Sequence, residues 1–503
     1  MMNLSIVYET LQVILLIATT LACENHKPHI VLVLVDDWGW ANVGYHLSSP
    51  TPEVDTPNID SLVEQGLELD QHYASNVCSP SRCSLLSGRL PIHVNDRNRN
   101  IALHNSDDPV SGYAGIPRQM TTLGTKMKQG GYATHVVGKW NVGMATADHT
   151  PKGRGFDSSL IYFSSSNDYY TQQQGECDGK PIVDLWDSGR PARELNGTGY
   201  EEGLFRDRIL DIVNNHLTST PLFLYYAPHI VHSPLDVPDS YLTNFDFIEN
   251  DNRQRYMAMV KYFDDVIGEL TDALKDKGMW NNTLLVLSSD NGGSSSAGNN
   301  HPLKGTKGSD WQGGIRVNAF VSGGYLPESM REQKTEGYIH LADWYATFSK
   351  LAGVDPTDEV AASAGLPAID SLDMWPLISG QNSTSPRTDI PISLDTLISG
   401  DYKILTGTVS QAGWTESDHP NGNSVSLPDQ RCKKKGCLYH IKDDPEERNN
   451  LASTMKSVLR EMRKKLKVYQ STHFDPDRGS VSPEACAAAL GKYEGFWGPF
   501  TDL

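Results

Sequence analysis

The chain has 503 residues, of which 38% are hydrophobic, so it is long enough to bury the core of one large domain with a smaller one beside it. Its formal net charge of −19, without a basic tail or stripe, argues against nucleic acid or an anionic membrane surface as the main partner. After the first 22 residues, no segment is apolar and long enough to predict a membrane span.

The first 22 residues predict a signal peptide. Their apolar run from Leu11 to Leu21 is too short to span a bilayer, and it ends in a small-residue pattern that suits cleavage after Ala22, although no Lys or Arg precedes it. We therefore expect the secretory pathway, with a lysosomal or extracellular destination. Protonation of all 16 histidines would reduce the net charge from −19 to −3, which favours an acidic, lysosome-like setting. Sequons for N-glycosylation stand at Asn196, Asn281 and Asn382.

Four apolar runs predict strands of a sheet. The run from His29 to Val35 is continuous and β-branched, as in a strand buried on both faces, and it ends abruptly in two aspartates. Similar runs occupy 133–137, 221–227 and 283–289. Helices are predicted to start within 56–62 and to cover 123–129, 203–216 and 256–274.

This alternation of strands and helices predicts an α/β domain with a largely parallel sheet. Residues 146–200 are polar and glycine-rich without a clear period, which predicts long surface loops. From residue 386 the pattern changes to short strands at 401–406 and 437–441 and a terminal helix with an apolar stripe between Leu451 and Tyr469. We therefore predict a large domain over 23–385 and a small α+β domain over 386–503.

Polar or charged side chains directly follow each of the four predicted strands. Since the carboxyl ends of parallel strands meet at one edge, where open α/β sheets bind ligands, these side chains are expected to form a site. Taken singly, the acids could be turn formers, the lysine a solvated side chain and the histidines ordinary loop residues. The residues are Asp36, Asp37, Lys139, His229, His232, Asp290 and Asn291.

The acidic members of this set predict a metal site. Asp36, Asp37, Asp290 and Asn291 offer oxygen ligands only, which suits Ca²⁺ or Mg²⁺, and no cluster of Cys and His accompanies them as zinc would need. We expect one calcium ion per chain, with Mg²⁺ less suited.

The stretch Cys78-Ser79-Pro80-Ser81-Arg82, which continues to Arg89, resembles the sulfatase signature. The alternative is a loop cysteine, paired with Cys83 and followed by a capped helix from Ser81. Further motifs occur in the order that this family has, and together they extend the resemblance over 28–503. The chain resembles most the arylsulfatase B (N-acetylgalactosamine-4-sulfatase) type. The motifs are Asp36 to Trp40, Thr56 to Asp60, Gly138 to Trp140, Asp290 to Gly293, Asp443 to Arg448 and Trp497 to Pro499.

The resemblance implies an alkaline-phosphatase-like fold, with a large mixed sheet flanked by helices and a smaller C-terminal α+β domain. It also implies hydrolysis of a sulfate ester on a sulfated sugar or glycosaminoglycan. In this family the cysteine at the position of Cys78 is oxidised to formylglycine by a formylglycine-generating enzyme. One hydroxyl of the hydrated aldehyde attacks sulfur and expels the alcohol, and sulfate is then eliminated as the other hydroxyl loses a proton.

The same resemblance implies a role for each residue of the predicted site. Modified Cys78 would join the four oxygen donors around calcium. The basic residues would bind the sulfate group, and His232 or Lys307 would help the leaving oxygen depart. These sulfate-binding residues are Arg82, Lys139, His232 and Lys307.

Two residues depart from the family pattern. Asn141 stands where the family has histidine, and a neutral amide cannot accept the proton as a base. Ser87 replaces the usual threonine, which keeps the hydroxyl group. Asn141 motivates an alternative function, a catalytically impaired sulfatase homologue that binds sulfated glycans. A metal-dependent phosphatase or phosphodiesterase is a third possibility, disfavoured because Cys78 would then be Ser or Thr.

The cysteine count predicts at least one unpaired thiol. With Cys23 outside the core and Cys78 converted, five cysteines remain, which is an odd number. Cys432 and Cys437 bracket a short turn and are the favoured pair. The five are Cys83, Cys177, Cys432, Cys437 and Cys486.

Overall fold

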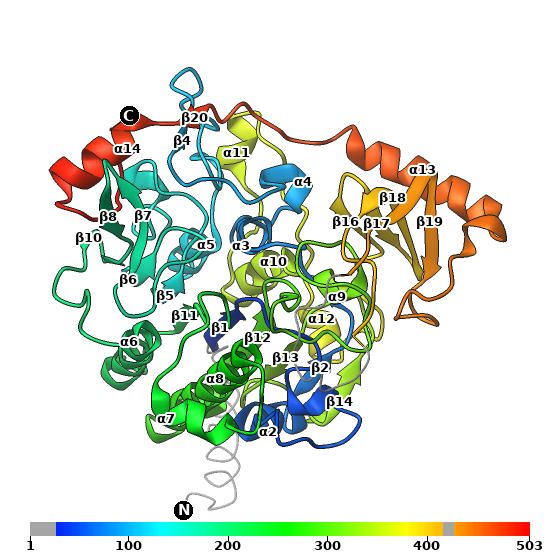
Figure 1. Cartoon of the computed structure of the whole chain (residues 1–503), viewed down its shortest axis with the longest axis horizontal. Coiled ribbons are helices and arrows are strands. Elements are labelled where there is room, and N and C mark those ends of the chain that lie inside the picture. The colour runs from blue at the N-terminus through cyan, green and yellow to red at the C-terminus, as the bar shows by residue number, and fades with distance from the viewer. Residues whose placement is uncertain (1–26, 416–426, 503) are drawn as a thin grey trace, which may run out of the picture.

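A computed structural model describes residues 27–415 and 427–502. A ten-stranded mixed sheet forms its centre, and the five middle strands run parallel (Figure 1). In sheet order the strands are β10 (Arg190–Pro191), β9 (Trp186–Asp187), β6 (Ser158–Tyr162), β5 (Ala133–Lys139), β11 (Leu222–Ala227), β1 (His29–Val35), β12 (Thr283–Ser289), β13 (Ala319–Ser322), β2 (Leu67–Leu69) and β14 (Gln333–Thr335).

Helices cover both faces of this sheet and bury its side chains. In β1, alternate residues enter two different cores, with Ile30 on one face and Val31 on the other, which explains the continuous apolar run. The first face carries α3 (Cys78–Ser87), α5 (Leu123–Gln129) and α10 (Asp343–Leu351). The second face carries α2 (Pro57–Glu64), α6 (Glu201–Asn215) and α8 (Asp251–Asp276). The predicted fold class is confirmed.

The prediction of surface loops over 146–200 is wrong in part. Strands β6, β9 and β10 extend the main sheet on this side, and β7 (Gln173–Cys177) pairs with β8 (Lys180–Val183) in a separate hairpin. These strands have two to five residues each, which is too short for a reliable alternation of polar and apolar side chains.

A smaller antiparallel sheet follows in the C-terminal part. Helix α13 (Lys456–Gln470) covers it, because Leu459, Met462 and Leu466 pack against Leu397 and other sheet residues. After α13 the chain returns to the large sheet's side of the molecule, where β20 (Ser480–Val481) pairs with β4 (Leu103–His104) and α14 (Pro483–Ala487) follows. The domain boundary at 386 stays a prediction. The sheet contains β16 (Asp389–Ser393), β17 (Thr396–Ser399), β18 (Tyr402–Val409) and β19 (Gln430–His440).

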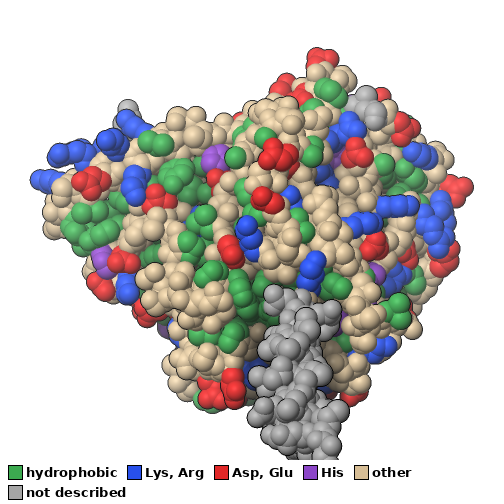
Figure 2. All heavy atoms as spheres, turned by 180° about the vertical axis from the view of Figure 1, so that it is seen from behind, with side chains coloured by type: hydrophobic (Ala, Val, Ile, Leu, Met, Phe, Trp, Pro, Cys, Tyr) green, Lys and Arg blue, Asp and Glu red, His purple; other side chains and the backbone are tan. Residues whose placement is uncertain are grey.

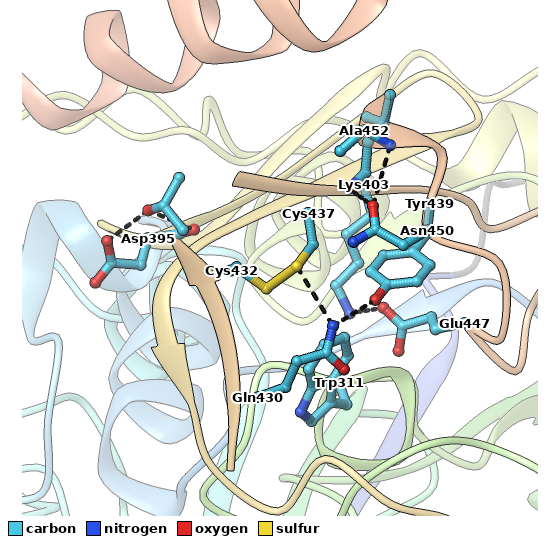
Figure 3. The surroundings of a disulfide bond; sticks show 12 residues. Trp311, Asp395, Lys403, Gln430, Cys432, Cys437, Tyr439, Glu447, Asn450 and Ala452 are labelled. Carbon is cyan, nitrogen blue, oxygen red and sulfur yellow. Dashed lines mark hydrogen bonds and ion pairs between the residues drawn. A yellow bond between two sulfur atoms is a disulfide. The ribbon is translucent and has the colours of Figure 1, made fainter. Parts of the chain in front are cut away.

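The favoured disulfide, Cys432–Cys437, is confirmed and bridges two positions of β19 (Figure 3). Next to it, Gln430 Nε2 donates a hydrogen bond to the Tyr439 hydroxyl (2.9 Å). A second disulfide joins Cys177 to Cys486. Cys78 and Cys83 are free, which confirms the predicted unpaired thiol and excludes the alternative in which these two are bonded to each other. The free cysteines and both disulfides account for every cysteine among the described residues.

Basic side chains gather over α13, at the upper left of Figure 2. The exposed members include Lys456, Arg460, Lys464 and Lys467, so the expectation that no basic stripe exists does not hold for this helix. No helix within 27–415 or 427–502 has the length and apolar character needed to cross a membrane. The predicted signal peptide lies outside the described residues.

Candidate active site

The carboxyl ends of four adjacent parallel strands form one edge of the large sheet. Asp36 and Asp37 follow β1, while Asp290 and Asn291 follow its neighbour β12. The two pairs are directly linked, because the Asp37 amide donates to Asp290 Oδ1 (3.3 Å) and Asn291 Nδ2 donates to Asp37 Oδ1 (2.7 Å). The structure thus brings together all four oxygen donors that the sequence predicted.

Helix α3 delivers Cys78 to this edge from above the sheet. The helix begins at Cys78, and the Sγ–H of this residue donates to Asp36 Oδ1 (3.4 Å). One turn later, Arg82 donates from Nε and Nη2 to Asp290 Oδ2 (3.0 and 2.8 Å). Cys78 and Arg82 are fully buried. A helix N-terminus attracts negative charge, so this position suits an anionic substrate group.

Three further basic or imidazole side chains point to the aspartates. Lys139 Nζ lies 2.5 Å from Asp36 Oδ2, Lys307 Nζ lies 2.7 Å from Asp37 Oδ2, and His232 Nε2 lies 3.7 Å from Asp37 Oδ2. The structure therefore places every residue assigned to sulfate binding around the same carboxylates.

A glycine controls how closely two of these strands approach. Gly138 has φ of 105°, and a Cβ atom there would lie 1.9 Å from the Ala227 carbonyl oxygen of β11. Any other residue would force β5 away from β11. Gly138 thus allows Lys139, the next residue, to reach the site.

The residues present fit a hard cation. Asp36, Asp37, Cys78 and His232 each offer a ligand atom, and these atoms lie within 4.8 Å of one another. Asn291 Oδ1 is buried and has no hydrogen-bond partner among the described residues, so its oxygen is available to a cation. Asp290 stands outside the four-residue group. His232 belongs to it, although the sequence placed His232 with the sulfate ligands only.

Burial and neighbouring charges shift the pKa values of three acids here. Burial would raise the pKa of Asp36, but the charges of Lys139, His232 and Arg82 hold it well below its usual range. Burial, together with the charge of Asp36, raises the pKa of Asp290 to about 6. The same two causes raise the pKa of the Cys78 thiol to about 12, so the unmodified thiol is protonated at neutral pH and is a weak nucleophile.

Asn141, the residue that departs from the family pattern, lies beside the residue that follows Cys78. Ser79 Oγ donates to the Asn141 carbonyl oxygen (3.0 Å), and Asn141 Oδ1 is buried without a hydrogen-bond partner among the described residues. The backbone of Asn141 is left-handed, with φ of 54°, a conformation that asparagine tolerates better than most residues. The Asn141 backbone is thus bonded to the residue that follows the candidate nucleophile.

Sequence reasoning missed two buried acids that hold the segment after β11, which contains His229 and His232. Glu202 Oε1 accepts hydrogen bonds from the His229 and Ile230 amides (2.5 and 3.1 Å), and Glu201 Oε2 lies 3.1 Å from His229 Nδ1. Both are fully buried at the start of α6. In the sequence they look like ordinary acidic residues of a first helical turn, so no local signal distinguishes them. His229 is enclosed by this arrangement and has no exposed surface.

Comparison with known proteins decides the family. The family model described as Sulfatase matches residues 28–354. The chain belongs to the sulfatase family. It is 31% identical to arylsulfatase J of Mus musculus over 94% of this chain and 80% of that protein. It is 29% identical to N-acetylgalactosamine-6-sulfatase of Mus musculus over 84% of this chain and 81% of that protein.

Solved structures agree with this assignment. The crystal structure of Ps i-CgsB superposes with a TM-score of 0.72 at 25% identity, over 92% of this chain and 97% of that one. The phosphonate monoester hydrolase of Agrobacterium radiobacter, at 17% identity and a TM-score of 0.54, over 89% of this chain and 96% of that one, shares the fold alone. As a sulfatase, the protein is a sulfuric ester hydrolase with an alkaline-phosphatase-like fold, and the phosphatase alternative loses its support.

Proposed function

We propose that this sulfatase removes sulfate from a sulfated sugar through a formylglycine formed from Cys78, with a calcium ion bound by Asp36, Asp37, Asp290 and Asn291. The observation that carries the proposal is the position of Cys78. It lies at the N-terminus of a buried helix, and its Sγ is 3.4 Å from one of the proposed calcium ligands. Cys83 lies in the apolar core on the same helix and contacts no aspartate of the site.

The formylglycine and the calcium ion would supply distinct chemistry. A formylglycine hydrate supplies an oxygen nucleophile, and a calcium ion supplies positive charge close to it. The oxygen donors and the orphaned Asn291 Oδ1 are the features of this chain that fit the ion. Magnesium is the less suited alternative, because it demands a more regular octahedron.

The basic side chains would hold and orient the sulfate group. Lys139, which is fully buried, pairs with Asp36, Lys307, which is partly exposed, pairs with Asp37, and Arg82 pairs with Asp290. Together they place three positive charges where the ester's negative charge increases on bond breakage.

His232 is placed to give a proton to the leaving oxygen. Its Nδ1 lies 2.6 Å from the Ser233 carbonyl oxygen, which can only accept a hydrogen bond, so Nδ1 must donate. Nε2, on the side of Asp37, can therefore give a proton to the substrate only from the doubly protonated ring, and burial lowers the pKa of His232. Burial lowers the pKa of Lys307, but the negative charges of Cys78, Asp37 and Asp36 outweigh it and raise this pKa overall, so Lys307 keeps its charge and His232 is the better acid.

The substrate class rests on the relatives. N-acetylgalactosamine-6-sulfatase is named for a sulfated sugar, and a solved relative at 25% identity, with a TM-score of 0.70, is in complex with k-i-k-neocarrahexaose. The arylsulfatase B type that the sequence resembles is named for 4-sulfated N-acetylgalactosamine, so the 4- and 6-positions are both candidates. Rates on 4-sulfated and 6-sulfated N-acetylgalactosamine, measured side by side, will decide between these positions.

The same proposal places the protein in the secretory pathway, in a lysosome or outside the cell. The two disulfides suit an oxidising compartment, and conversion of Cys78 requires the formylglycine-generating enzyme as a partner. Fractionation of expressing cells, with lysosomal and secreted material analysed separately, tests the destination.

Mass spectrometry and two variants test the nucleophile. Conversion lowers the mass of the peptide containing Cys78 by about 18 Da, from the covalent change alone. Cys78→Ala should abolish hydrolysis of an aryl sulfate without unfolding the protein, whereas Cys83→Ala should keep activity. An unchanged rate in Cys78→Ala, or a loss confined to Cys83→Ala, would refute the assignment.

A catalytically impaired, glycan-binding homologue is the second candidate, and Asn141 is the observation that favours it. That function requires binding of a sulfated glycan without measurable release of sulfate from fully converted protein. Sulfate release by converted protein at any rate above that of the Cys78→Ala variant excludes it.

A further inference from the structure

A recess of about 490 Å³ opens next to the candidate active site. Such a volume is typical of small-molecule pockets, which span roughly 300–1,000 Å³. We call it the C-terminal recess, because residues near the end of the chain form one of its walls. Its lining includes Asn98, Asn141, Gln174 and Trp497, with Arg99 and Glu176 as the charged residues.

Two hydrogen bonds connect lining residues of the C-terminal recess to Ser79, the neighbour of the candidate nucleophile. Asn98 Oδ1 accepts from the Ser79 amide (2.9 Å), and the Asn141 carbonyl accepts from Ser79 Oγ (3.0 Å). Ser79 immediately follows Cys78. Two lining residues, Asn98 and Asn141, are therefore bonded to the neighbour of Cys78, so the recess lies beside the site and a group bonded to the sulfated sugar would extend into it.

The C-terminal segment is fixed in place as the far wall. The Cys177–Cys486 disulfide ties it to β7, and the Trp497 indole N–H donates to the Gln174 carbonyl oxygen (2.8 Å). The Trp497 amide also donates to the Val183 carbonyl oxygen of β8 (2.9 Å). These links hold a broad apolar ring in the lining, although more than 300 residues separate it from the β7–β8 hairpin in the chain.

The lining favours an uncharged partner. Arg99 and Glu176 carry opposite charges, and the Arg99 guanidinium is already bound to Asp96 and Asp475 (3.3 and 3.1 Å). The remaining polar groups are amides and hydroxyls, which pair with sugar hydroxyl and acetamido groups. Trp497 is 8% exposed, and this exposed part of the indole offers an apolar surface for the C–H side of a sugar ring.

We propose that the C-terminal recess binds an uncharged sugar residue linked to the sulfated one, and so selects substrates by their neighbouring residue. The proposal rests on the proposed function, since it presumes a sulfated sugar at Cys78. It assigns Trp497 and Gln174 to substrate selection and to no step of the chemistry.

Paired substrates test this selection in converted enzyme. We would compare 4-nitrophenyl sulfate, which has no second sugar, with two sulfated disaccharides, one linked to a neutral hexose and the other to a uronic acid. Trp497→Ala should lower kcat/KM for the neutral disaccharide about fivefold more than for the aryl sulfate, since aromatic contacts are worth about 1 kcal/mol. Gln174→Ala, at a half-buried hairpin position, should shift the same ratio less strongly. This second variant keeps the proposal testable if Trp497→Ala fails to fold.

Two matched variants serve as controls. Arg97→Met changes a neighbouring arginine outside the recess, and Trp280→Ala removes a distant tryptophan, so both should leave the substrate ratio unchanged. A second readout, calorimetric binding of the neutral disaccharide to Cys78→Ala protein, should weaken by the same factor when Trp497→Ala is added.

The outcomes separate the two proposals. If converted enzyme hydrolyses the aryl sulfate and neither Trp497→Ala nor Gln174→Ala changes the ratio of kcat/KM values, the proposal for the C-terminal recess is wrong. The proposed function is then unaffected. Preference for the uronic-acid disaccharide in wild type overturns the claim of an uncharged partner. Absence of hydrolysis of all three substrates by converted enzyme overturns the proposed function itself.

Discussion

Replacement of Asn141 by histidine should convert a slow enzyme into a faster one. The structure allows this change at little cost, because Asn141 borders the C-terminal recess and its left-handed φ of 54° is among those that histidine also adopts. We expect the free energy of unfolding to change by less than about 1 kcal/mol. The variant should therefore report on chemistry and not on folding.

The expected gain follows from the missing base. General-base assistance is typically worth about 10²–10⁴-fold in rate, or about 3–5 kcal/mol of barrier. In the wild type, the neutral Asn141 amide cannot take a proton during release of sulfate, although the first step has His232 and three positive charges to assist it. Release should therefore limit turnover, and Asn141→His should raise steady turnover about a hundredfold without tighter substrate binding.

Stopped-flow measurement with 4-nitrophenyl sulfate separates the two steps. Wild type should release about one equivalent of nitrophenol per converted site in a burst and then continue slowly, and the histidine variant should show a smaller burst and a faster steady rate. Asn141→Gln is the matched control, because it keeps the amide and adds no base, so its steady rate should not rise.

A wild type that shows no burst and turns over as fast as the histidine variant would refute this reasoning. Another base would then serve, and His229 would be the first to test. Its ring is enclosed, stacks on Tyr169 with 4.2 Å between ring centroids and lies 3.1 Å from Glu201, which is the structural reason to expect that it does not serve.

Three further predictions concern stability. Replacing Cys177 and Cys486 by serine opens a link across 309 residues, which should cost about 6 kcal/mol on chain-entropy grounds, and unfolding in denaturant that matches wild type would contradict it. Adding Ca²⁺ at about a hundredfold excess over its Kd to chelated protein should add about 2.7 kcal/mol of stability and raise Tm, and an unchanged Tm would count against the metal site. Burial raises the pKa of Asp264 to about 6 from 3.8, so its ionisation penalises the folded state above about pH 6 and this penalty disappears as the pH falls towards 4. Asp264→Asn should therefore flatten the dependence of unfolding free energy on pH between 4 and 6 by up to about 3 kcal/mol, and equal pH slopes for the two proteins would disprove this.

The edge of the sheet could be predicted from the sequence because each strand carries its own signal. Buried parallel strands are continuous apolar runs, and a polar residue directly after such a run must lie at the carboxyl edge. Asp36 and Asp290 could therefore be placed together without knowledge of the strand order. Their hydrogen-bonded neighbours Asp37 and Asn291 followed from the same argument.

The supporting structure could not be predicted in this way, because its signals are not local. Glu201 and Glu202 look like surface acids of a helix start, and only the fold turns them inward against His229. The strands of 146–200 are too short to show a period. Trp497 lines the C-terminal recess because the C-terminal segment returns to the β7–β8 hairpin. No sequence pattern in that segment predicts this return.

The balance of charge at the site explains how its buried acids and bases can be stable together and how the site can still bind an anionic sulfate ester. Three carboxylates and three cations meet at the sheet edge, and each carboxylate accepts from at least one cation, so the residues alone form a nearly neutral network in which only Lys307 is partly exposed. A bound divalent cation would add two positive charges to this network. The site would then be positive overall, which favours a sulfate ester although the whole chain carries a net charge of −19. The six groups are Asp36, Asp37, Asp290, Arg82, Lys139 and Lys307.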